Sequence, residues 1–231
     1  MQAVILAGGL GTRLRPLTKT VPKPMVPVGD TPYLQHQLRL LQQQTITDIV
    51  LLTGYLGEQI EDYFGDGSEF GIQVRYSRED TPLGTGGALK AASELLADSF
   101  LVIYGDSYLP IQYGQVLQML NQSTASGVVT VYDNQFEDTG VINNIAIDDS
   151  NVITKYIKDE PDDPDLNYVE AGVLALTTKL VDEIPAGKVS LEQEIFPRLI
   201  ADRRLLGFVT TQRFYDIGTP ERLEAIADLF Q

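Results

Sequence analysis

The sequence predicts an α/β protein with a mostly parallel, mixed sheet, helices on both sheet faces and a small antiparallel sub-region. Two observations support this fold class: short apolar runs alternate with helical patterns, and 43% of the 231 residues are hydrophobic, enough for a full core. Strands that alternate with helices form parallel sheets, and continuous apolar runs are typical of strands buried on both faces. We expect a single domain over 1–231, divided into two halves, 1–125 and 126–231.

The first half predicts four strands, each followed by a helix. The strands are expected at 4–6, 49–52, 72–76 and 100–104, and the helices at 32–41, 56–64, 84–96 and 112–121. Thr31 is the expected N-cap of the first helix, and Pro32 occupies its first turn, where proline is favoured. Leu34, Leu38 and Leu41 recur at helical spacing and predict the face that packs on the sheet.

The second half changes character after a strand predicted at 127–132. A β-ribbon is expected over 139–158, with its turn at 148–151, and the acidic stretch 159–167 is expected to be a loop. The ribbon is the antiparallel sub-region of the predicted fold. The remaining elements are a strand at 169–176, a helix at 191–203, more strand within 208–215 and a helix at 220–230.

The charge balance is strongly acidic, since 17 Lys+Arg stand against 32 Asp+Glu and give a net charge of −15. Nucleic acids and anionic membranes are polyanions, so we expect neither as a partner, whereas a divalent metal suits such a chain. The sequence has no apolar run long enough to span a membrane and no signal-peptide pattern, which fits a cytoplasmic location. It has no cysteine, which excludes disulfides and thiolate metal sites.

A cationic glycine loop contrasts with this acidity. The first 29 residues contain Arg13, Arg15, Lys19 and Lys23 but no acidic residue. The predicted strand at 4–6 leads into a glycine-rich stretch, whose backbone N–H groups can form a concave anion site. Because Arg13 and Lys23 add full charges, we expect the loop to hold the phosphates of a nucleoside triphosphate.

Three other interpretations of this loop compete. The dinucleotide fingerprint G-x-G-x-x-G matches Gly9 and Gly11 but has Leu14 at its third glycine. A P-loop requires G-K-[ST] at its end, where Gly11, Thr12 and Arg13 stand instead. A plain turn with incidental charges does not account for four cations without a counter-acid.

Two aspartates are expected at the same edge of the sheet as the loop. Asp106 follows the strand at 100–104, and Asp216 follows the strand residues that end at Tyr215. In open α/β sheets, ligands bind outside the carboxyl ends of the strands. Either aspartate taken alone also fits a turn, so the interpretation depends on three signals falling at one edge.

Together these segments resemble the sugar-1-phosphate nucleotidyltransferases, also called nucleotide-sugar pyrophosphorylases. The family has a Rossmann-like, nucleotide-diphospho-sugar transferase-like fold. The matching motifs are L-A-G-G-L-G-T-R-L-R-P-L-T at 6–18, P-K-P at 22–24, P-L-G-T-G-G-A at 82–88, G-D at 105–106 and D-I-G-T-P at 216–220. The chain looks most like the small, single-domain members, such as heptose-1-phosphate and mannose-1-phosphate guanylyltransferases, and we expect no C-terminal β-helix.

The resemblance implies that a sugar-1-phosphate oxygen attacks the α-phosphorus of a nucleoside triphosphate and pyrophosphate leaves. Such a reaction depends on in-line positioning and charge stabilisation. Arg13, Lys23 and Asp106 are the implied catalytic residues, and Asp106 and Asp216 are the implied ligands of Mg²⁺. The residues implied to bind the nucleotide are Leu6, Ala7, Gly8, Gly9, Gly11, Thr12, Arg13, Lys23, Glu79 and Gly84.

In the family, the base is read by the first loop and by the segment before the second glycine cluster, which here contains Glu79 and Gly84. The Glu79 carboxylate only accepts hydrogen bonds, and guanine offers adjacent N1–H and N2–H₂ donors. This match favours GTP. UTP, dTTP and CTP stay open, because a solvated loop charge is the competing interpretation of Glu79.

The acceptor site departs from the family pattern. Relatives carry F-x-E-K-P, whereas residues 156–161 read Y-I-K-D-E-P, which leaves Lys158 as the cation for the sugar phosphate. Many relatives have Asn where Glu170 stands, and Glu170 could accept from sugar hydroxyls or pair with Lys158. Lys158, Glu170 and Gly140 are thus the expected sugar-phosphate-binding residues, and we expect a sugar other than plain glucose.

Two further functions remain open at this point. A catalytically dead relative would bind a nucleotide sugar and regulate a partner. An enzyme of the same fold would instead transfer a uridylyl or cytidylyl group to another sugar phosphate or to phosphocholine, and the acidic loop at 159–165 suits such a cationic acceptor. A homo-oligomer is compatible with the sequence but is not indicated by it.

Overall fold

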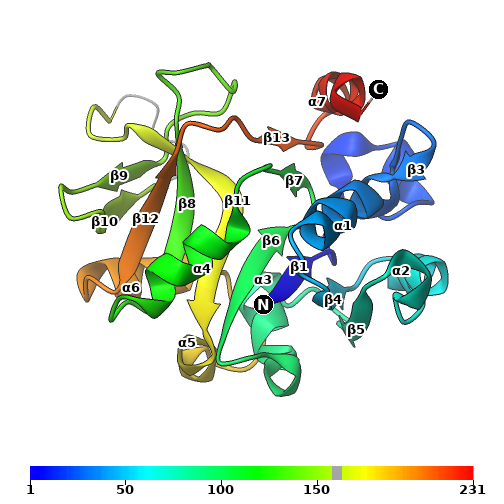
Figure 1. Cartoon of the computed structure of the whole chain (residues 1–231), viewed down its shortest axis with the longest axis horizontal. Coiled ribbons are helices and arrows are strands. Elements are labelled where there is room, and N and C mark those ends of the chain that lie inside the picture. Colours follow the sequence, from blue (N-terminus) through cyan, green and yellow to red (C-terminus); the bar gives the residue numbers. More distant parts are fainter. Residues whose placement is uncertain (158–162, 231) are drawn as a thin grey trace.

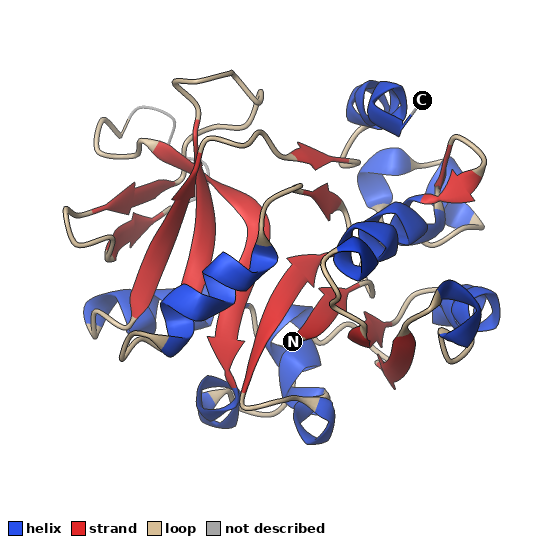
Figure 2. Cartoon of the chain, in the orientation of Figure 1, coloured by secondary structure: helices blue, strands red, loops and turns tan. Residues whose placement is uncertain are grey.

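The computed structural model describes residues 1–157 and 163–230 of the chain. One large twisted sheet runs through the molecule, with helices on both of its faces (Figures 1 and 2). Its strands are β1 (Gln2–Leu6), β4 (Asp48–Thr53), β5 (Gln73–Arg78), β6 (Ser99–Tyr104), β8 (Gly127–Asp133), β9 (Ile145–Ile147), β10 (Ile153–Tyr156), β11 (Tyr168–Thr177) and β12 (Leu205–Thr210). The helices are α1 (Tyr33–Gln43), α2 (Gly57–Phe64), α3 (Gly84–Ala91), α4 (Tyr113–Asn121), α5 (Thr178–Glu183), α6 (Phe196–Ala201) and α7 (Pro220–Ala227).

The sheet is mixed, as predicted, and the two halves of the chain differ in how their strands pair. Strands run in the order β10-β9-β11-β6-β1-β4-β5, and β11 also pairs with β8, which in turn pairs with β12. The pairs within β6-β1-β4-β5 are parallel, whereas β11 is antiparallel to both β6 and β8. The carboxyl ends of β1, β4, β5 and β6 therefore lie at one edge of the sheet.

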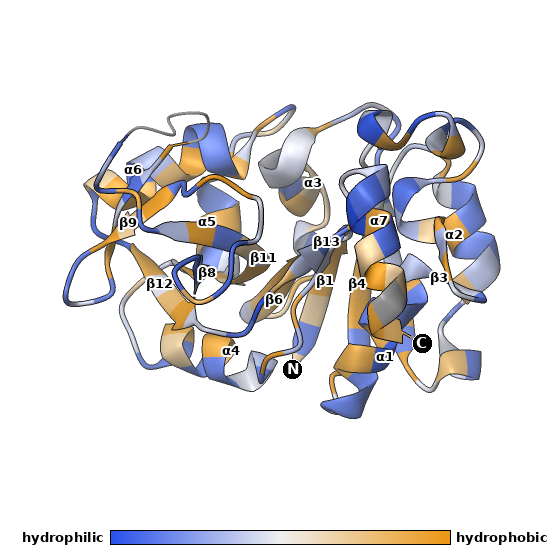
Figure 3. Cartoon of the chain, turned by 90° about the horizontal axis from the view of Figure 1, so that it is seen from above, coloured by the Kyte–Doolittle hydropathy of each residue, from blue (hydrophilic) through white to orange (hydrophobic). Residues whose placement is uncertain are grey.

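The hydrophobic core divides between the two faces of the sheet. Helices α1, α2 and α4 supply one cluster, which includes Leu34, Leu38 and Leu41, the face predicted from their spacing. Helices α3, α5 and α6 supply the other cluster, which includes Leu89 and Phe196. Hydrophobic residues accordingly concentrate on the strands and on the helix sides that face them (Figure 3).

The antiparallel ribbon is confirmed in a shorter form. β9 and β10 pair antiparallel, and Asp148 accepts backbone hydrogen bonds from Ser150 and Val152 at the turn between them. Two small antiparallel pairs lie outside the main sheet: β2 (Pro27–Val28) with β3 (Thr31–Pro32), and β7 (Ser107–Tyr108) with β13 (Tyr215–Asp216).

Several predicted boundaries are wrong. Thr31 is not an N-cap, because it pairs with Val28 in the β2–β3 hairpin, and Pro32 itself is the residue before α1. Helix α3 ends at Ala91 and is followed by a separate 3-10 turn, so the helix predicted at 84–96 is two segments.

Three errors lie in the second half. The helix predicted at 191–203 begins as a π-helical turn (Leu191–Ile195) and continues as α6. Helix α5 was not predicted, and the strand expected within 208–215 is two strands separated by 211–214.

Within the described part of the chain, no helix is both long and apolar enough to cross a membrane.

Candidate functional site

A cavity of about 480 Å³ lies at the carboxyl ends of the parallel strands. Its lining includes the ends of β1 and β6, and Leu52 of β4. All ten residues expected to bind the nucleotide contribute to this lining: Leu6, Ala7, Gly8, Gly9, Gly11, Thr12, Arg13, Lys23, Glu79 and Gly84. Asp106 lines the same cavity, so the structure brings the separate sequence signals together in space.

The glycine loop is built on backbone contacts that continue the sheet. The Ala7 N–H donates to the Leu52 carbonyl at 2.8 Å, which extends the pairing of β1 with β4 by one residue. Gly11 has φ +60°, and a Cβ there would lie 3.0 Å from side-chain atoms of both Lys23 and Thr18. A side chain at Gly11 would therefore push Lys23 away, and glycine suits both the backbone and the space.

Lys23 and Asp106 form a direct ion pair across the cavity edge. The Lys23 Nζ lies 2.5 Å from Asp106 Oδ2, and the two side chains are 12% and 31% exposed. Lys23 begins a 3-10 turn (Lys23–Met25), while Asp106 lies two residues after the end of β6. The ion pair thus lies at the edge of the cavity and is only partly screened by water.

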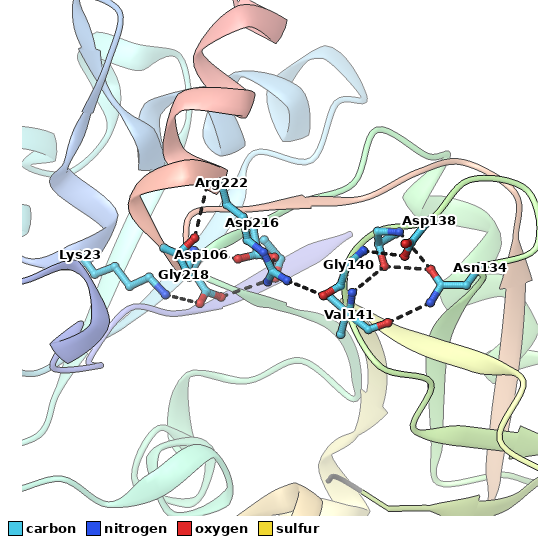
Figure 4. Close-up of polar contacts among 12 residues, drawn as sticks. Lys23, Asp106, Asn134, Asp138, Gly140, Val141, Asp216, Gly218 and Arg222 are labelled. Atoms are coloured by element: carbon cyan, nitrogen blue, oxygen red, sulfur yellow. Dashed lines mark hydrogen bonds and ion pairs between the residues drawn. The ribbon is translucent and has the colours of Figure 1, made fainter. Parts of the chain in front are cut away.

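Asp216 reaches the neighbourhood of Asp106 through the pairing of β13 with β7. In that pairing Asp216 faces Ser107, the residue after Asp106, and the Ile217 N–H donates to the Asp106 carbonyl at 3.0 Å. Asp216 Oδ1 accepts from the Gly218 N–H at 2.7 Å, and Gly218 lines the cavity (Figure 4). A Cβ at Gly218 would lie 3.4 Å from Arg13 Nη2, so the arginine approaches the same turn.

These two carboxylates fit a magnesium ion. Mg²⁺ is usually held by one or two carboxylates together with substrate phosphates and water, rather than by a protein cage. Asp106 and Asp216 supply carboxylate oxygens of this kind, and no larger group of His, Cys, Asp or Glu side chains that could hold a metal is found among the described residues. Asp106 and Asp216 would therefore hold the ion only together with the ligand.

Glu79 lies on the opposite side of β1 from Asp106, just after β5. Its Oε2 accepts from the Leu83 N–H at 2.9 Å, which fixes the carboxylate over the loop. A Cβ added at Gly8 or Gly54 would come within 2.8 or 2.9 Å of Glu79 Oε1, so both glycines make room for it. Burial raises the pKa of Glu79, and the Leu83 hydrogen bond opposes that shift only in part.

Among the lining residues that sequence reasoning missed, three have polar side chains: Tyr104, Thr85 and Glu192. Glu192 lies on the π-helical turn, and its carboxylate accepts from the Tyr104 hydroxyl at 2.5 Å and from the Thr85 hydroxyl at 2.8 Å. Burial raises the pKa of Glu192, but hydrogen bonds from Tyr104, Ser190 and Thr85 outweigh burial and leave the pKa below its ordinary value. A π-helical turn often marks a functional site, but the sequence pattern does not reveal this turn, so the sequence offered no signal for Glu192.

The expected acceptor residues are not part of the cavity lining among the described residues. Glu170, on β11, accepts a hydrogen bond from the Tyr156 hydroxyl, and its N–H donates to Asn144 Oδ1 at 3.1 Å. Gly140, with φ +67°, lies in the loop after β8, and its carbonyl accepts from Arg222. Lys158 lies outside the described residues, so its pairing with Glu170 stays a prediction.

The fold and the site define an α/β protein with its cavity at the carboxyl ends of parallel strands, surrounded by a glycine loop, two cations and acidic side chains. A family profile described as nucleotidyl transferase matches residues 2–230. The chain therefore belongs to the nucleotidyl transferase family, as the motifs predicted.

Individual relatives agree with this assignment. The chain is 35% identical over 225 residues to a mannose-1-phosphate guanylyltransferase of Mycobacterium tuberculosis, covering 96% of this chain but 62% of that protein. It is 31% identical over 222 residues to a D-glycero-alpha-D-manno-heptose 1-phosphate guanylyltransferase of Campylobacter jejuni, covering 96% of both chains. The chain thus spans under two thirds of the length of the mannose-1-phosphate relative.

A solved structure is similar over the full chain. The structure of HddC from Yersinia pseudotuberculosis complexed with GMP-PN superposes with a TM-score of 0.81 and 28% identity, covering 100% of this chain and 99% of that one. The predicted fold class is therefore confirmed.

Proposed function

We propose that the protein transfers a nucleoside monophosphate from a nucleoside triphosphate, with GTP favoured, to a sugar-1-phosphate. The products would be a nucleoside-diphosphate sugar and pyrophosphate. The observation that carries this proposal is the single cavity lined by the ten expected nucleotide residues and Asp106. The relatives named as guanylyltransferases and the GMP-PN complex of HddC support the choice of guanine.

In this reaction the protein mainly positions charge. Arg13 and Lys23 would bind the β- and γ-phosphates, and the N–H groups of the loop from Gly8 to Gly11 would donate to phosphate oxygens. As the α-phosphorus is attacked, negative charge grows on the leaving pyrophosphate, where both cations stabilise it. Lys23 would exchange its contact with Asp106 for one with phosphate, so ligand binding would free the carboxylate.

We propose Mg²⁺ as the cofactor, held by Asp106 and Asp216. The ion would supply positive charge between these carboxylates and the phosphates, and so let an acidic protein accept a triphosphate. Asp216 would be oriented for this role by the Gly218 N–H.

We propose that Glu79 reads guanine. The carboxylate is fixed by the Leu83 N–H and faces Gly8, so it can accept from adjacent N1–H and N2–H₂ donors of a base that lies over the loop.

Lys158, Glu170 and Gly140 remain the residues proposed to bind the acceptor sugar phosphate. The division into a nucleotide half (1–125) and an acceptor half (126–231), and a cytoplasmic location, belong to the same proposal.

Pyrophosphate release tests the proposal directly. The purified protein would be incubated with Mg²⁺ and each of five nucleoside triphosphates against a panel of sugar-1-phosphates and phosphocholine. We expect release with GTP and one class of sugar-1-phosphate. Release with another nucleotide would refute the role of Glu79, phosphocholine as the best acceptor would refute the sugar assignment, and nucleotide-sugar binding without turnover would indicate a regulator.

A further inference from the structure

Arg222 of α7 connects two parts of the proposed site that are far apart in the sequence. Its Nη1 lies 2.7 Å from Asp216 Oδ2, and its Nη2 donates to the Gly140 carbonyl at 3.0 Å (Figure 4). One planar guanidinium thus holds a proposed metal ligand with one nitrogen and the proposed acceptor loop with another. The Arg222 and Asp216 side chains are 31% and 16% exposed, so water screens this contact only in part.

The loop that Arg222 holds, residues 134–143, is ordered by its own hydrogen bonds. Asn134 Nδ2 donates to the Val141 carbonyl at 2.9 Å, and Asn134 Oδ1 accepts from the Thr139 hydroxyl at 2.8 Å. Asp138 Oδ1 accepts from the Gly140 N–H at 2.8 Å. Because these hydrogen bonds join residues within the loop, a displacement of Gly140 would also shift the other residues of 134–143.

A second arginine holds the same loop without touching the metal ligand. Arg213 pairs with Glu137 and lies over the Tyr215 ring at 5.5 Å from its centroid. Arg213 and Arg222 therefore form a natural comparison, because both tie the loop to the C-terminal segment and only Arg222 is paired with Asp216.

The two contacts of Arg222 have opposite effects on the proposed site: one opposes metal binding, and the other orders the acceptor loop. A dication at Asp216 and a guanidinium on the same carboxylate repel each other, so Arg222 must oppose metal binding. The contact with Gly140, by contrast, fixes the loop on which acceptor binding is proposed to depend. The carboxylate has further lone pairs, so the ion could bind while Arg222 stays in place.

We propose that Arg222 is a positioning residue that couples the metal site at Asp216 to the acceptor loop at 134–143. The inference rests on the proposed function for the roles of Asp216 and Gly140. It goes beyond that function, because it makes metal affinity and loop order depend on one side chain and gives them opposite responses to its removal.

The test compares Arg222→Gln, Arg222→Lys and the matched control Arg213→Gln. Manganese binding, followed by electron paramagnetic resonance on the protein saturated with a non-hydrolysable GTP analogue, reports the metal site without turnover. Amide hydrogen exchange of residues 134–143, measured without metal, reports the loop. The Michaelis constants for GTP and the acceptor complete the set.

We expect Arg222→Gln to tighten manganese binding about fivefold, as loss of one partly screened charge implies, and to speed loop exchange. Its acceptor KM would rise, whereas its GTP KM at saturating metal would fall, because the metal and the nucleotide bind together. Arg222→Lys would keep manganese affinity near that of the parent but would still loosen the loop, because an ammonium cannot reproduce the fork of a guanidinium. Arg213→Gln would affect the loop alone.

Unchanged manganese affinity in Arg222→Gln, or an equal change in Arg213→Gln, would overturn the coupling. So would tighter metal binding with undisturbed loop exchange. If the parent protein released no pyrophosphate from any substrate pair, the proposed function would fail, yet the manganese and exchange measurements would still decide on Arg222.

Discussion

Lys23 and Asp106 are paired with each other at the cavity edge, and this pairing leads to the first prediction. Lys23→Ala and Asp106→Asn should each abolish pyrophosphate release, because the first removes a proposed phosphate-binding charge and the second a proposed metal ligand. Asp106 is 31% exposed and can be hydrated once Lys23 is gone, so Lys23→Ala should cost only about 1 kcal/mol of stability. Urea unfolding beside the activity assay checks both expectations.

Lys19 provides the control for this experiment. It belongs to the same cationic stretch but is exposed, and it is not part of the cavity lining among the described residues. Lys19→Ala should retain turnover. Near-normal activity in Lys23→Ala or Asp106→Asn would remove the basis of the site assignment.

The second prediction concerns the pH dependence of GTP binding. Burial raises the pKa of Glu79, so its carboxylate becomes protonated at a higher pH than an ordinary glutamate, whose pKa is about 4.3. The protonated group no longer offers two acceptors, so GTP affinity should fall as pH falls through the raised pKa. Calorimetric titrations between about pH 7 and pH 5 would follow this loss.

Glu79→Gln is the matched variant for this measurement. It should weaken GTP binding about 10- to 100-fold and remove the acid-limb pH dependence, because an amide does not titrate. Discrimination against ITP, which lacks the N2 amino group, should also shrink. A variant that keeps both the affinity and the pH profile of the parent would show that Glu79 does not contact the base.

The residues that sequence analysis found and missed differ in a physical way. Gly11, Lys23 and Asp106 stand in short motifs that are legible in the sequence, and their combination in one order along the chain carried the resemblance. The Thr85–Glu192 hydrogen bond joins positions 107 residues apart, and only the tertiary fold brings them together. No local pattern encodes such a contact.

At the scale of elements, the packing of α3 gives the third prediction. The N–H groups of Gly86 and Gly87 donate to the Val189 carbonyl at 2.9 and 3.1 Å, and a Cβ at Gly87 would collide with the carbonyl oxygen of Gly187. Gly87→Ala should therefore push α3 away from this loop and cost about 1–3 kcal/mol of unfolding free energy. Urea denaturation would measure this loss.

Gly9→Ala is the control, because a Cβ there would have no described atom within 4 Å. It should leave stability unchanged or slightly raised, since alanine reduces the entropy of the unfolded chain. The added methyl would instead enter the nucleotide cavity and raise the KM for GTP. Equal stability losses in the two variants would contradict the packing argument.

The predicted elements were correct where one sequence pattern, such as an apolar run, was strong. They were wrong where two patterns pointed to different structures or where the element was too short to show a pattern. The apolar runs of β1, β4 and β6 marked buried strands unambiguously. Thr31 has a side chain that suits an N-cap, but its backbone pairs with Val28 in the β2–β3 hairpin instead. Helix α5 spans only Thr178–Glu183, too few residues to show a helical period.

For the whole molecule, buried tyrosines predict how the protein unfolds in alkali. Burial is the main cause that raises the pKa of Tyr33, Tyr104 and Tyr113 above the ordinary value. Their contribution to stability is fully present below the unfolded pKa of about 10 and is lost as pH rises above it. Stability should therefore fall as pH rises above about pH 10, by about 1.4 kcal/mol per pH unit for each tyrosine that ionises only in the unfolded chain. Urea unfolding at several pH values would measure this slope.

Tyr33→Phe tests the origin of this slope. The Tyr33 hydroxyl is buried and has no hydrogen-bond partner among the described residues, so its removal should cost nothing at neutral pH. The alkaline slope should become shallower by the share of one tyrosine, about 1.4 kcal/mol per pH unit. An unchanged slope would mean that other groups control alkaline unfolding.

The global architecture was predictable because alternation of strands and helices restricts the possible sheets. The sequence did not indicate how β11 would join the halves, since β11 pairs with β8 along one side and with β6 and then β9 along the other. Strand partners depend on long-range packing, which periodicity does not record.

The last helix returns to the first segment of the chain. Ile217 and Ile226 pack with Val28 and Tyr33 in a small separate cluster. During synthesis on the ribosome, the glycine loop and its strand leave the exit tunnel before the C-terminal residues. The small cluster, and with it the final position of Asp216, cannot form until residues near 226 have left the tunnel. In the nascent protein, the glycine loop would thus be present long before Asp216 is held beside Asp106.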